Sequence, residues 1–472
     1  MNQSDAAMRI DAAIRGTMLS VTNPFDGKVV GEVAWADQAD VSQAIESAEA
    51  GYRTNRSLPR WRRAEFLQKA SEIVARDAEQ LARMIASESG KPIKHARKEV
   101  RRATNTLLLC AEEAKRIGGE ILPFDNYGPL EGWSGYYTHE PLGIIVGITP
   151  FNDPFNLVAH KVGPALAAGN SIIVKPSEHT PLSALRLAEI LTEAGAPAGL
   201  VNVLVGSHSA NQRLVADCRV RMVSFTGGPE SAEKIMREAG LKRFAMELGG
   251  NSSVIVMADA DVDRAVRSCV SGAFWANGQN CIGVQRIFVH SSVLKAFCEK
   301  FRRQVLRLKV GDPMQDDTDV GPLITDAHAA RVERIVHEAL SQGAECLHGG
   351  ERVGRVLSPS VLLNTPSQCA AWRDEIFGPV VNIEPFDDVD AAIARANSVE
   401  SNIHAAIFTR SLEEVRRATR DLEGAGIIVN DSTDFRHDGM PFGGSKYGGI
   451  GREGVRFAIA EMTQTKMVAY SP

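Results

Sequence analysis

Strand-like and helix-like segments alternate along the chain from residue 143 onward, and this alternation limits the possible folds more than any other feature of the sequence. Short apolar runs are separated by helical patterns at the spacing of βαβ units, in which helices join parallel strands. The sequence therefore predicts an α/β fold built on a parallel sheet. The strand candidates are residues 143–150, 171–176, 201–206 and 221–228, and the helical patterns are 182–195 and 229–240.

A second alternating region begins near residue 250, and no internal repeat or low-complexity linker separates it from the first. The length of 472 residues allows two or three domains, at roughly 100–200 residues each. We expect one α/β unit from about residue 143 and a second from about residue 250, preceded by residues 38–120, which are mainly helical. Within the helical segment, Asp40 and Gly90 are the expected start and stop of helices. The strand candidates of the second region are 251–257, 285–290, 381–386, 404–409 and 426–430, and its helical patterns are 261–278 and 293–308.

Two further segments alternate between apolar and polar residues, as edge strands do. They are residues 131–141, with the sequence EGWSGYYTHEP, and the tail 461–472, with the sequence EMTQTKMVAYSP. Edge strands expose unpaired backbone groups, so these two could pair with each other or with another subunit. We group residues 125–141 and 460–472 as a third, small β element.

The composition argues against several classes of function. A formal net charge of -5 offers no basic surface for nucleic acid. No apolar run approaches the roughly 18 residues of a membrane helix, and the N-terminal segment lacks the apolar core of a signal peptide. The 7 cysteines include no CxxC pair, and the 11 histidines form no HxH or HExxH pattern. We therefore expect a cytoplasmic protein with no membrane partner, no disulfide framework and no metal site.

One cysteine has unusual sequence neighbours: Cys281 lies in the run WANGQNCIG at 275–283. Cys281 follows amide side chains and lies between Gly278 and Gly283, whereas a packing cysteine usually has apolar neighbours. Glycines allow close approach of a substrate, and polar neighbours leave a thiol accessible, as nucleophilic attack requires. A lone intracellular cysteine is more often structural, so a nucleophile, a metal ligand and a bystander all stay open at this point.

Two polar residues lie where catalytic groups are often found. Glu247, in MELGGNS, stands between apolar residues before two glycines, and a carboxylate in a partly apolar cleft can act as a general base. Asn152, in ITPFNDPFN, lies in a loop that prolines restrict, and a fixed amide can donate a hydrogen bond to an oxyanion. The alternatives are a helix-terminal glutamate and an ordinary turn asparagine.

Two strand ends have features of a nucleotide site, although the GxGxxG fingerprint is absent. Gly227 and Gly228 end a strand candidate just before a helix, where backbone N–H groups suit a phosphate. Lys175 and Glu178 lie at and just after the end of another strand candidate. A carboxylate at such a position can bind both ribose hydroxyls and would repel a 2′-phosphate. The alternative for Gly227 and Gly228 is a plain turn, and the alternative for Lys175 and Glu178 is a solvated loop.

Taken together, these motifs resemble the aldehyde dehydrogenase superfamily, in the right order from about residue 20 to the end of the chain. The resemblance implies a Rossmann-like NAD-binding domain at 1–124 and 142–249, an α/β catalytic domain at 250–440 and a small oligomerisation element at 125–141 and 460–472. It also implies a homodimer or homotetramer. The matching stretches are PLGIIVGITPFNDP, GNSIIVKPSEHTPLSA, VSFTGG, MELGGNS, GQNCIG, DEIFGPVV and MPFGGSKYGGIGREG.

The resemblance also implies a mechanism. Cys281 matches the family's nucleophile, Glu247 its general base and Asn152 its oxyanion donor, so an aldehyde would pass through a cysteine thiohemiacetal and a thioester to a carboxylate. Glu247 favours hydrolysis of the thioester over transfer to coenzyme A, and Glu178 favours NAD over NADP. The matching cofactor-binding residues are Phe151, Lys175, Glu178, Gly227, Glu375 and Phe377.

The substrate prediction is a small hydrophilic or anionic aldehyde. FNLVAHK, STDFRHDGMPFGG and GREGV most resemble the lactaldehyde, non-phosphorylating glyceraldehyde-phosphate and phosphonoacetaldehyde dehydrogenase branch. Arg436 and Arg102 could bind an anionic tail, the alternative being that each is an exposed arginine. Asp153 beside Asn152, and Asn280 beside Cys281, argue against a doubly charged substrate. A hydroxyaldehyde or a monoanionic semialdehyde is favoured, and an aromatic aldehyde stays open.

Three other functions stay open from the sequence. One is a dehydrogenase that transfers the acyl group to coenzyme A. Another is a catalytically silent relative, such as the family's lens crystallins, although the presence of Cys281, Glu247 and Asn152 argues against it. The third is a cysteine hydrolase, which would need a histidine beside Cys281 in space.

Overall fold

The computed structural model describes residues 18–472, and its first unit is centred on a six-stranded sheet in the order β21-β9-β8-β5-β6-β7. All of these strands are parallel except β21, which pairs antiparallel with β9. The chain starts at the central β5 and extends to both sides of it, so a topological switch point lies between β5 and β8. The bounds are β5 (Ile144–Ile148), β6 (Ser171–Lys175), β7 (Val201–Val203), β8 (Val220–Thr226), β9 (Arg243–Glu247) and β21 (Gly449–Ile450).

Helices cover both faces of this sheet, which is why its strands read as continuous apolar runs. Alternate residues of β5 point to opposite faces: Ile144 and Val146 pack with one helix set, and Ile145 packs with the other. The first set is α1 (Gln38–Ser57), α7 (His208–Ala216) and α8 (Pro229–Ala239). The second set is α2 (Arg60–Arg76), α3 (Ala78–Ser89), α4 (Ile93–Arg116), α5 (Asn156–Ala168), α6 (Pro181–Glu193) and α15 (Val455–Glu461).

Of the two predicted ends of the early helices, the stop at Gly90 is confirmed and the start at Asp40 is wrong. Gly90 caps α3 in the left-handed conformation, with φ of 72°. The predicted start at Asp40 is wrong, because Asp37 is the N-cap: its carboxylate accepts the N–H groups of Ala39 and Asp40. Asp40 bonds back to the N–H of Asp37, which completes a capping box.

The second unit contains a seven-stranded sheet in the order β12-β15-β16-β11-β10-β18-β19, parallel except for β12. The strands near 345 and 360 were not predicted. The strand bounds are β10 (Ser253–Val256), β11 (Arg286–His290), β12 (Glu345–His348), β15 (Ser360–Leu363), β16 (Val380–Phe386), β18 (His404–Phe408) and β19 (Gly426–Val429). The helices are α9 (Val262–Phe274), α10 (Ser291–Val305), α11 (Asp326–Ser341), α12 (Ala370–Arg373), α13 (Val389–Asn397) and α14 (Leu412–Asp421).

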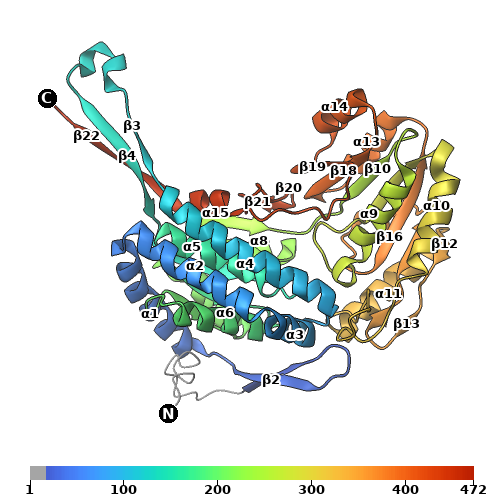
Figure 1. The fold of residues 1–472 in the computed structure, drawn as a ribbon, viewed down its shortest axis with the longest axis horizontal. Helices are drawn as coiled ribbons and strands as arrows, with labels where there is room; N and C mark the ends of the chain where they lie inside the picture. Colours follow the sequence, from blue (N-terminus) through green and yellow to red (C-terminus); the bar gives the residue numbers. More distant parts are fainter. Residues whose placement is uncertain (1–17) are drawn as a thin grey trace.

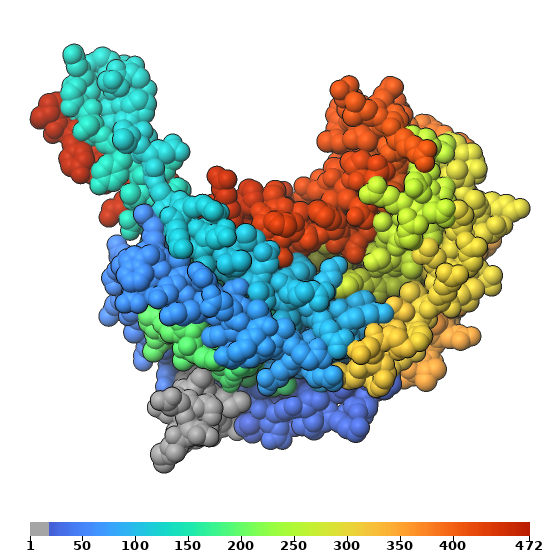
Figure 2. Space-filling model, in the orientation of Figure 1, coloured from blue at the N-terminus to red at the C-terminus, as the bar shows by residue number. Residues whose placement is uncertain are grey.

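A three-stranded antiparallel sheet forms an arm that projects from the body (Figures 1 and 2). In it, β22 (Thr463–Tyr470) pairs with β4 (Ser134–Pro141) along its whole length, so of the two alternatives for the edge segments, the single chain shows pairing with each other. The third strand, β3 (Gly119–Ile121), pairs with β4 and was not predicted. Two short 3-10 helices follow it, η2 (Phe124–Asn126) and η3 (Gly128–Leu130).

The remaining strands form small two-stranded sheets. No helix among residues 18–472 is both long and apolar enough to cross a membrane. The N-terminal segment used in the signal-peptide argument, and the predicted start of the first domain at residue 1, lie outside the described residues. The small sheets are β1 (Met18–Thr22) with β2 (Val29–Ala34), β13 (Arg352–Val353) with β14 (Val356–Leu357), and β17 (Ser401–Asn402) with β20 (Ser445–Lys446).

Candidate active site

The candidate residues of the first unit lie where parallel strands end, at one edge of the sheet. Asn152 follows β5, Lys175 ends β6, Gly227 follows β8 and Glu247 ends β9. The carboxyl ends of β5 and β8 flank the switch point, which is where ligands bind in open α/β sheets. Backbone hydrogen bonds tie these ends together: Thr149 N–H donates to the carbonyl of Lys175 at 3.1 Å, and Gly227 N–H donates to that of Glu247 at 3.0 Å.

Glu247 is a buried carboxyl group without a hydrogen-bond partner. Its side chain is only 2% exposed, and neither carboxyl oxygen has a partner among the described residues. Burial raises the pKa of Glu247 well above its usual value, and nearby Glu453 raises it further, against the opposing effect of Lys161. A carboxyl group with a raised pKa is a stronger base, once ionised, than an exposed glutamate.

Cys281 lies half-buried against the apolar side chains of Ile282, Ile403 and Phe442. Burial raises the pKa of its thiol to about 12, and the largest opposing effect comes from the Arg436 cation. The carboxyl groups of Glu247 and Glu375 raise this pKa as well. Residues far apart in the sequence therefore share the surroundings of this thiol.

The turn before Cys281 is held in a strained conformation. Ala276, Asn277 and Gly278 are all left-handed, with φ of 49°, 64° and 69°. This breaks the predicted helix 261–278, because α9 ends at Phe274 and a 3-10 turn, η4 (Trp275–Gly278), follows. Non-glycine residues in this region cost about 1 kcal/mol or more each, so the surroundings must hold the turn in place.

Asn277 holds the turn and was missed by the sequence analysis. Its side-chain amide donates to the carbonyls of Gly90 and Pro322 at 3.1 and 2.9 Å, and its oxygen accepts the N–H of Gly321 at 2.7 Å. The Asn-Gly dipeptide, a common turn signal, could have identified it. Gly278 is needed for packing rather than for substrate approach, because a Cβ there would lie 2.1 Å from the carbonyl oxygen of Gly378.

Asn152 has a side-chain amide available for a ligand. It is half-buried, and among residues 18–472 its side chain makes no hydrogen bond. Its neighbour Asp153 is fixed by ion pairs to Lys91 and to Arg102, the latter at 3.2 Å. The loop is thus anchored on one side of Asn152 while the amide stays free to donate.

Glu375 and Phe377 come from the second unit and meet the first unit here. Glu375 accepts the N–H of Gly250 at 3.4 Å, and burial raises the pKa of Glu375 to about 7. The glycines after Glu247 make room for it, since a Cβ at Gly249 would lie 2.1 Å from its carboxylate. The Phe377 ring packs edge-on against Phe151 with centroids 5.8 Å apart.

The features that suit a dinucleotide lie at the same edge of the first sheet. The helix α8 begins at Pro229, after Gly228, with no side-chain cap, and a Cβ at Gly228 would meet open space. Pro229 has no N–H, and the N–H groups of Ser231 and Ala232 donate to the Gly228 carbonyl, so a phosphate here would be received by the N–H groups of Gly228 and Glu230. Burial lowers the pKa of Lys175 while the nearby Glu178 raises it, so the two side chains lie in each other's field. The exposed Glu178 lines a cavity of about 220 Å³. These residues fit a nicotinamide dinucleotide.

Among residues 18–472, no group of three or more His, Cys, Asp or Glu side chains is arranged to hold a metal ion.

The alternative interpretation of Arg436 and Arg102, that each is an ordinary exposed arginine, is wrong for both, because neither side chain is exposed. The Arg436 side chain is 7% exposed, donates to Glu453 at 2.9 Å and stacks 3.6 Å from the ring centroid of Phe442. Arg102 donates to Asp153 at 3.2 Å and to Asp438 at 2.8 Å. The Nε–H of each arginine is buried without a partner.

Two charged or polar residues of α5 join this set and were also missed. Lys161 donates to Ser224 at 3.0 Å and to Glu453 at 3.2 Å, and His160 lies 3.0 Å from the carboxylate of Asp438. Every residue of α5 is buried. A lysine is almost never fully buried unless it is paired, so Lys161 within a mainly apolar helix was the available signal.

Comparison with known proteins identifies close relatives along the whole chain. The model of the aldehyde dehydrogenase family matches residues 12–468. Aspartate-semialdehyde dehydrogenase 1 of Pseudomonas canavaninivorans is 52% identical over 460 residues, which cover 98% of this chain and 98% of that protein. The 3-sulfolactaldehyde dehydrogenase of Priestia aryabhattai is 40% identical over 451 residues, which cover 95% of this chain and 94% of that protein.

Solved structures match equally well. Aldehyde dehydrogenase 21 of Physcomitrella patens, in complex with the reaction product succinate, has a TM-score of 0.95 at 36% identity, with 98% of this chain and 96% of that chain covered. The glyceraldehyde-3-phosphate dehydrogenase GapN of Methanocaldococcus jannaschii, in complex with NADP, has a TM-score of 0.93 at 36% identity, with 97% and 100% covered. The predicted fold class is confirmed.

Proposed function

This chain belongs to the aldehyde dehydrogenase family, and from that premise we propose that it oxidises a short aldehyde bearing one carboxylate to the corresponding acid. The hydride acceptor is a nicotinamide dinucleotide. Aspartate semialdehyde is the first compound to test, because a relative of that name shares 52% of the sequence.

The position of Arg436 is the observation that carries this proposal. Among the charged groups that affect the thiol of Cys281, Arg436 has the largest influence, and it is the one that lowers the pKa of the thiol. One terminal nitrogen of Arg436 is used by Glu453, while its Nε–H is buried without a partner. An unpaired buried donor costs about 1–3 kcal/mol, and a substrate carboxylate would satisfy it.

The carboxylates around the site favour a substrate of low net charge. Asp153 and Asp438 both bind Arg102, so that cation is already neutralised and is the weaker candidate for a substrate contact. Asp153, adjacent to the proposed oxyanion donor Asn152, and Glu453, beside Arg436, already pair with the cations that a second negative charge on the substrate would need. A single carboxylate suits this arrangement, and a substrate ammonium group would find nearby acids.

The proposed chemistry begins at Cys281. The thiol transfers its proton to the ionised Glu247 carboxylate, and the thiolate attacks the aldehyde carbon to form a thiohemiacetal. The amide of Asn152 donates to the oxyanion. A bound nicotinamide dinucleotide supplies the hydride acceptor that turns this adduct into a thioester. Glu247, returned to its ionised form, takes a proton from water, which attacks the thioester and releases the carboxylic acid product and the thiol.

The proposed cofactor is NAD rather than NADP. A dinucleotide would be held by the first turn of α8 at its phosphates, by Lys175 and Glu178 at the adenosine ribose, and by Glu375 at the other ribose. The negative charge of the exposed Glu178 would repel a 2′-phosphate. One structural neighbour is bound to NADP and another is named as NAD-dependent, so the fold itself accepts either cofactor.

Hydrolysis is the proposed fate of the thioester because Glu247 is present, buried and strongly basic when ionised.

We further propose that the arm formed by β3, β4 and β22 joins subunits. Its apolar side chains are solvent-exposed in the single chain, with Ile121 86% and Met467 58% exposed.

The test is reduced-cofactor absorbance, followed with NAD or NADP across a panel of aldehydes. The panel holds aspartate semialdehyde, succinic semialdehyde, lactaldehyde, 3-sulfolactaldehyde, phosphonoacetaldehyde and benzaldehyde, with Cys281→Ala as the control. We expect the highest kcat/KM with a monocarboxylate semialdehyde, without added coenzyme A. A preference for a neutral or dianionic aldehyde, or a rate that depends on coenzyme A, would contradict the proposal.

A further inference from the structure

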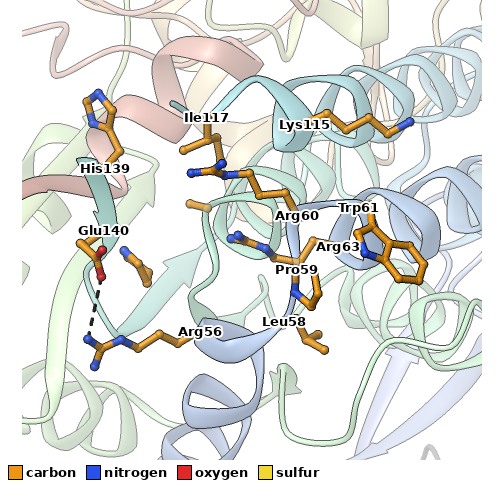
Figure 3. Close-up of a pocket in the computed structure, with 12 residues that line it drawn as sticks. Arg56, Leu58, Pro59, Arg60, Trp61, Arg63, Lys115, Ile117, His139 and Glu140 are labelled. Carbon is orange, nitrogen blue, oxygen red and sulfur yellow. Dashed lines mark ion pairs between the residues drawn. The ribbon is translucent and has the colours of Figure 1, made fainter. Parts of the chain in front are cut away.

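A second concave site lies away from the candidate active site, at the base of the arm. The cavity has a volume of about 630 Å³, within the range of small-molecule pockets. Its walls come from the α1–α2 connection, the C-terminal end of α4 and the end of β4 (Figure 3). None of the residues assigned to the proposed reaction lines it.

The walls of this cavity carry a marked excess of positive charge. Arg56, Arg60, Arg63 and Lys115 line it, against the single carboxylate of Glu140. That carboxylate is 3.8 Å from Arg56, on the opposite side of the cavity from Arg60 and Arg63 (Figure 3). Among residues 18–472, Arg60, Arg63 and Lys115 form no ion pair. The protein therefore leaves three of these cations without a neutralising partner.

Arg63 is the least ordinary of them, because it is buried without a counter-ion. Only 8% of the residue is exposed. One terminal nitrogen donates to the carbonyl of Ala167 at 3.0 Å, near the end of α5, and the Nε–H is buried without a partner. Burial and the nearby Arg60 lower the pKa of Arg63 to about 10. Charged side chains are rarely buried unless they are paired.

The local backbone accommodates this buried cation. Gly169 has φ of 95°, and a Cβ at that position would lie 2.6 Å from the terminal nitrogen of Arg63. Figure 3 shows the guanidinium groups of Arg60 and Arg63 side by side in the cavity. Two like charges in proximity repel each other, and an anion between them would relieve that repulsion.

We propose that this cavity binds a small phosphate-bearing metabolite with at least two negative charges. Guanidinium groups bind phosphate oxygens through paired, charge-assisted hydrogen bonds, and two adjacent arginines suit one phosphate group. Lys115 and Arg56 add charge at the rim. The site is separate from the aldehyde reaction, so its occupancy does not depend on the proposed function.

The experiment is isothermal titration calorimetry of the full chain with pyrophosphate, at low ionic strength and with NAD saturating. The saturating NAD blocks the phosphate turn at Gly227, which is the other place where the probe could bind. We expect one pyrophosphate per chain, at least tenfold weaker binding in Arg60→Glu, and weaker binding as salt is raised. Arg60 is exposed at the start of α2, so this substitution leaves the packing of the core intact.

The matched control is Arg62→Glu. Arg62 lies on the same helical turn and carries the same charge, but it does not line the cavity and pairs instead with Glu65. We expect less than a twofold change in this variant. Equal weakening by both substitutions would show non-specific attraction and overturn the site.

Two further measurements separate the competing explanations. Citrate, a carboxylate anion of comparable charge, should bind at least tenfold more weakly than pyrophosphate, and equal or tighter binding would overturn the assignment to phosphate. Sedimentation of wild type and Arg60→Glu should show the same oligomer. If the variant dissociates and wild type does not bind pyrophosphate, the cations serve a subunit contact and the proposal fails.

Discussion

Replacing Arg436 with Gln would test the substrate proposal most directly. Glutamine keeps a donor for Glu453 while removing the positive charge. The comparison uses two substrates of equal chain length, succinic semialdehyde and butyraldehyde, which differ by one carboxylate. The measured quantity is the ratio of their kcat/KM values, because any general damage to the site affects both substrates and cancels in the ratio.

The magnitude follows from the burial of the guanidinium group. Its side chain is 7% exposed, so solvent screens it weakly. Two unit charges about 4 Å apart interact by roughly 4 kcal/mol at an effective dielectric constant of about 20. Glu453 already shares this cation, and the substrate carboxylate must lose water, so we expect a net effect of about 2–3 kcal/mol, in the upper part of the range of about 1.5–3 kcal/mol for a hydrogen bond to a charged group. The preference for the anionic substrate should therefore fall about 30- to 150-fold.

A second effect of the same substitution serves as an internal check. Arg436 lowers the pKa of the Cys281 thiol, so its loss should slow both substrates to a similar extent. Arg456→Gln is the matched control, since Arg456 is exposed on α15, close to Glu453 in the sequence. Thermal unfolding of both variants would show whether they are folded. A folded Arg436→Gln protein whose substrate ratio is unchanged would refute the assignment of the substrate contact.

The remaining predictions concern the base, the cofactor and the frame of the site. Glu247→Gln should lower kcat at least 100-fold and allow acyl-enzyme to accumulate, visible by intact mass; an unchanged kcat would show that another group activates water. Because burial raises the pKa of Glu247, its ionised fraction grows with pH, so wild-type kcat should rise from pH 6 to 9. A flat pH profile would contradict that reasoning. Glu178→Ser should reduce the ratio of kcat/KM with NAD to that with NADP, and an unchanged ratio would count against repulsion of the 2′-phosphate. Glu88 accepts the N–H groups of Leu182 and Ser183 at the start of α6, at 2.9 and 3.0 Å. Glu88→Ala should therefore lower the free energy of unfolding by about 2–4 kcal/mol, measured by urea titration, and a loss below the error of the titration would refute this capping role.

Most of the secondary structure around the site could be predicted from the sequence because its signals are local. The strands β5 and β6 are mainly apolar runs buried on both faces. Such runs can be recognised in the sequence without knowledge of the rest of the fold. The errors occurred where local signals compete with tertiary contacts. The helical pattern of α9 continues into Trp275 and Ala276, yet the chain turns there because Asn277 finds three buried backbone partners that lie elsewhere in the chain.

The candidate site was predicted in part. The residues that could be predicted are those with a local sequence signal, and the contacts that could not be predicted join distant parts of the chain. Asn152, Glu247 and Cys281 lie in short motifs that resemble a known family, so their candidacy needed no contact information. The electrostatic setting of those residues could not be predicted in this way. Lys161 meets Glu453 across 292 positions of sequence, and Arg102 meets Asp438 across 336. No local pattern specifies such pairs.

The sequence by itself determined the α/β class and most of the elements around the site, and it named the candidate reactive groups, since hydrophobic periodicity and short motifs are properties of contiguous residues. Only the tertiary structure decided the protonation and the charge at those groups. Burial removes water from Glu247 and Cys281, and the cost of a charge without water depends on every group folded around it. The same reason governs the cavity at the base of the arm, where Arg60 and Arg63 become a binding site only because the fold leaves them together without a counter-ion.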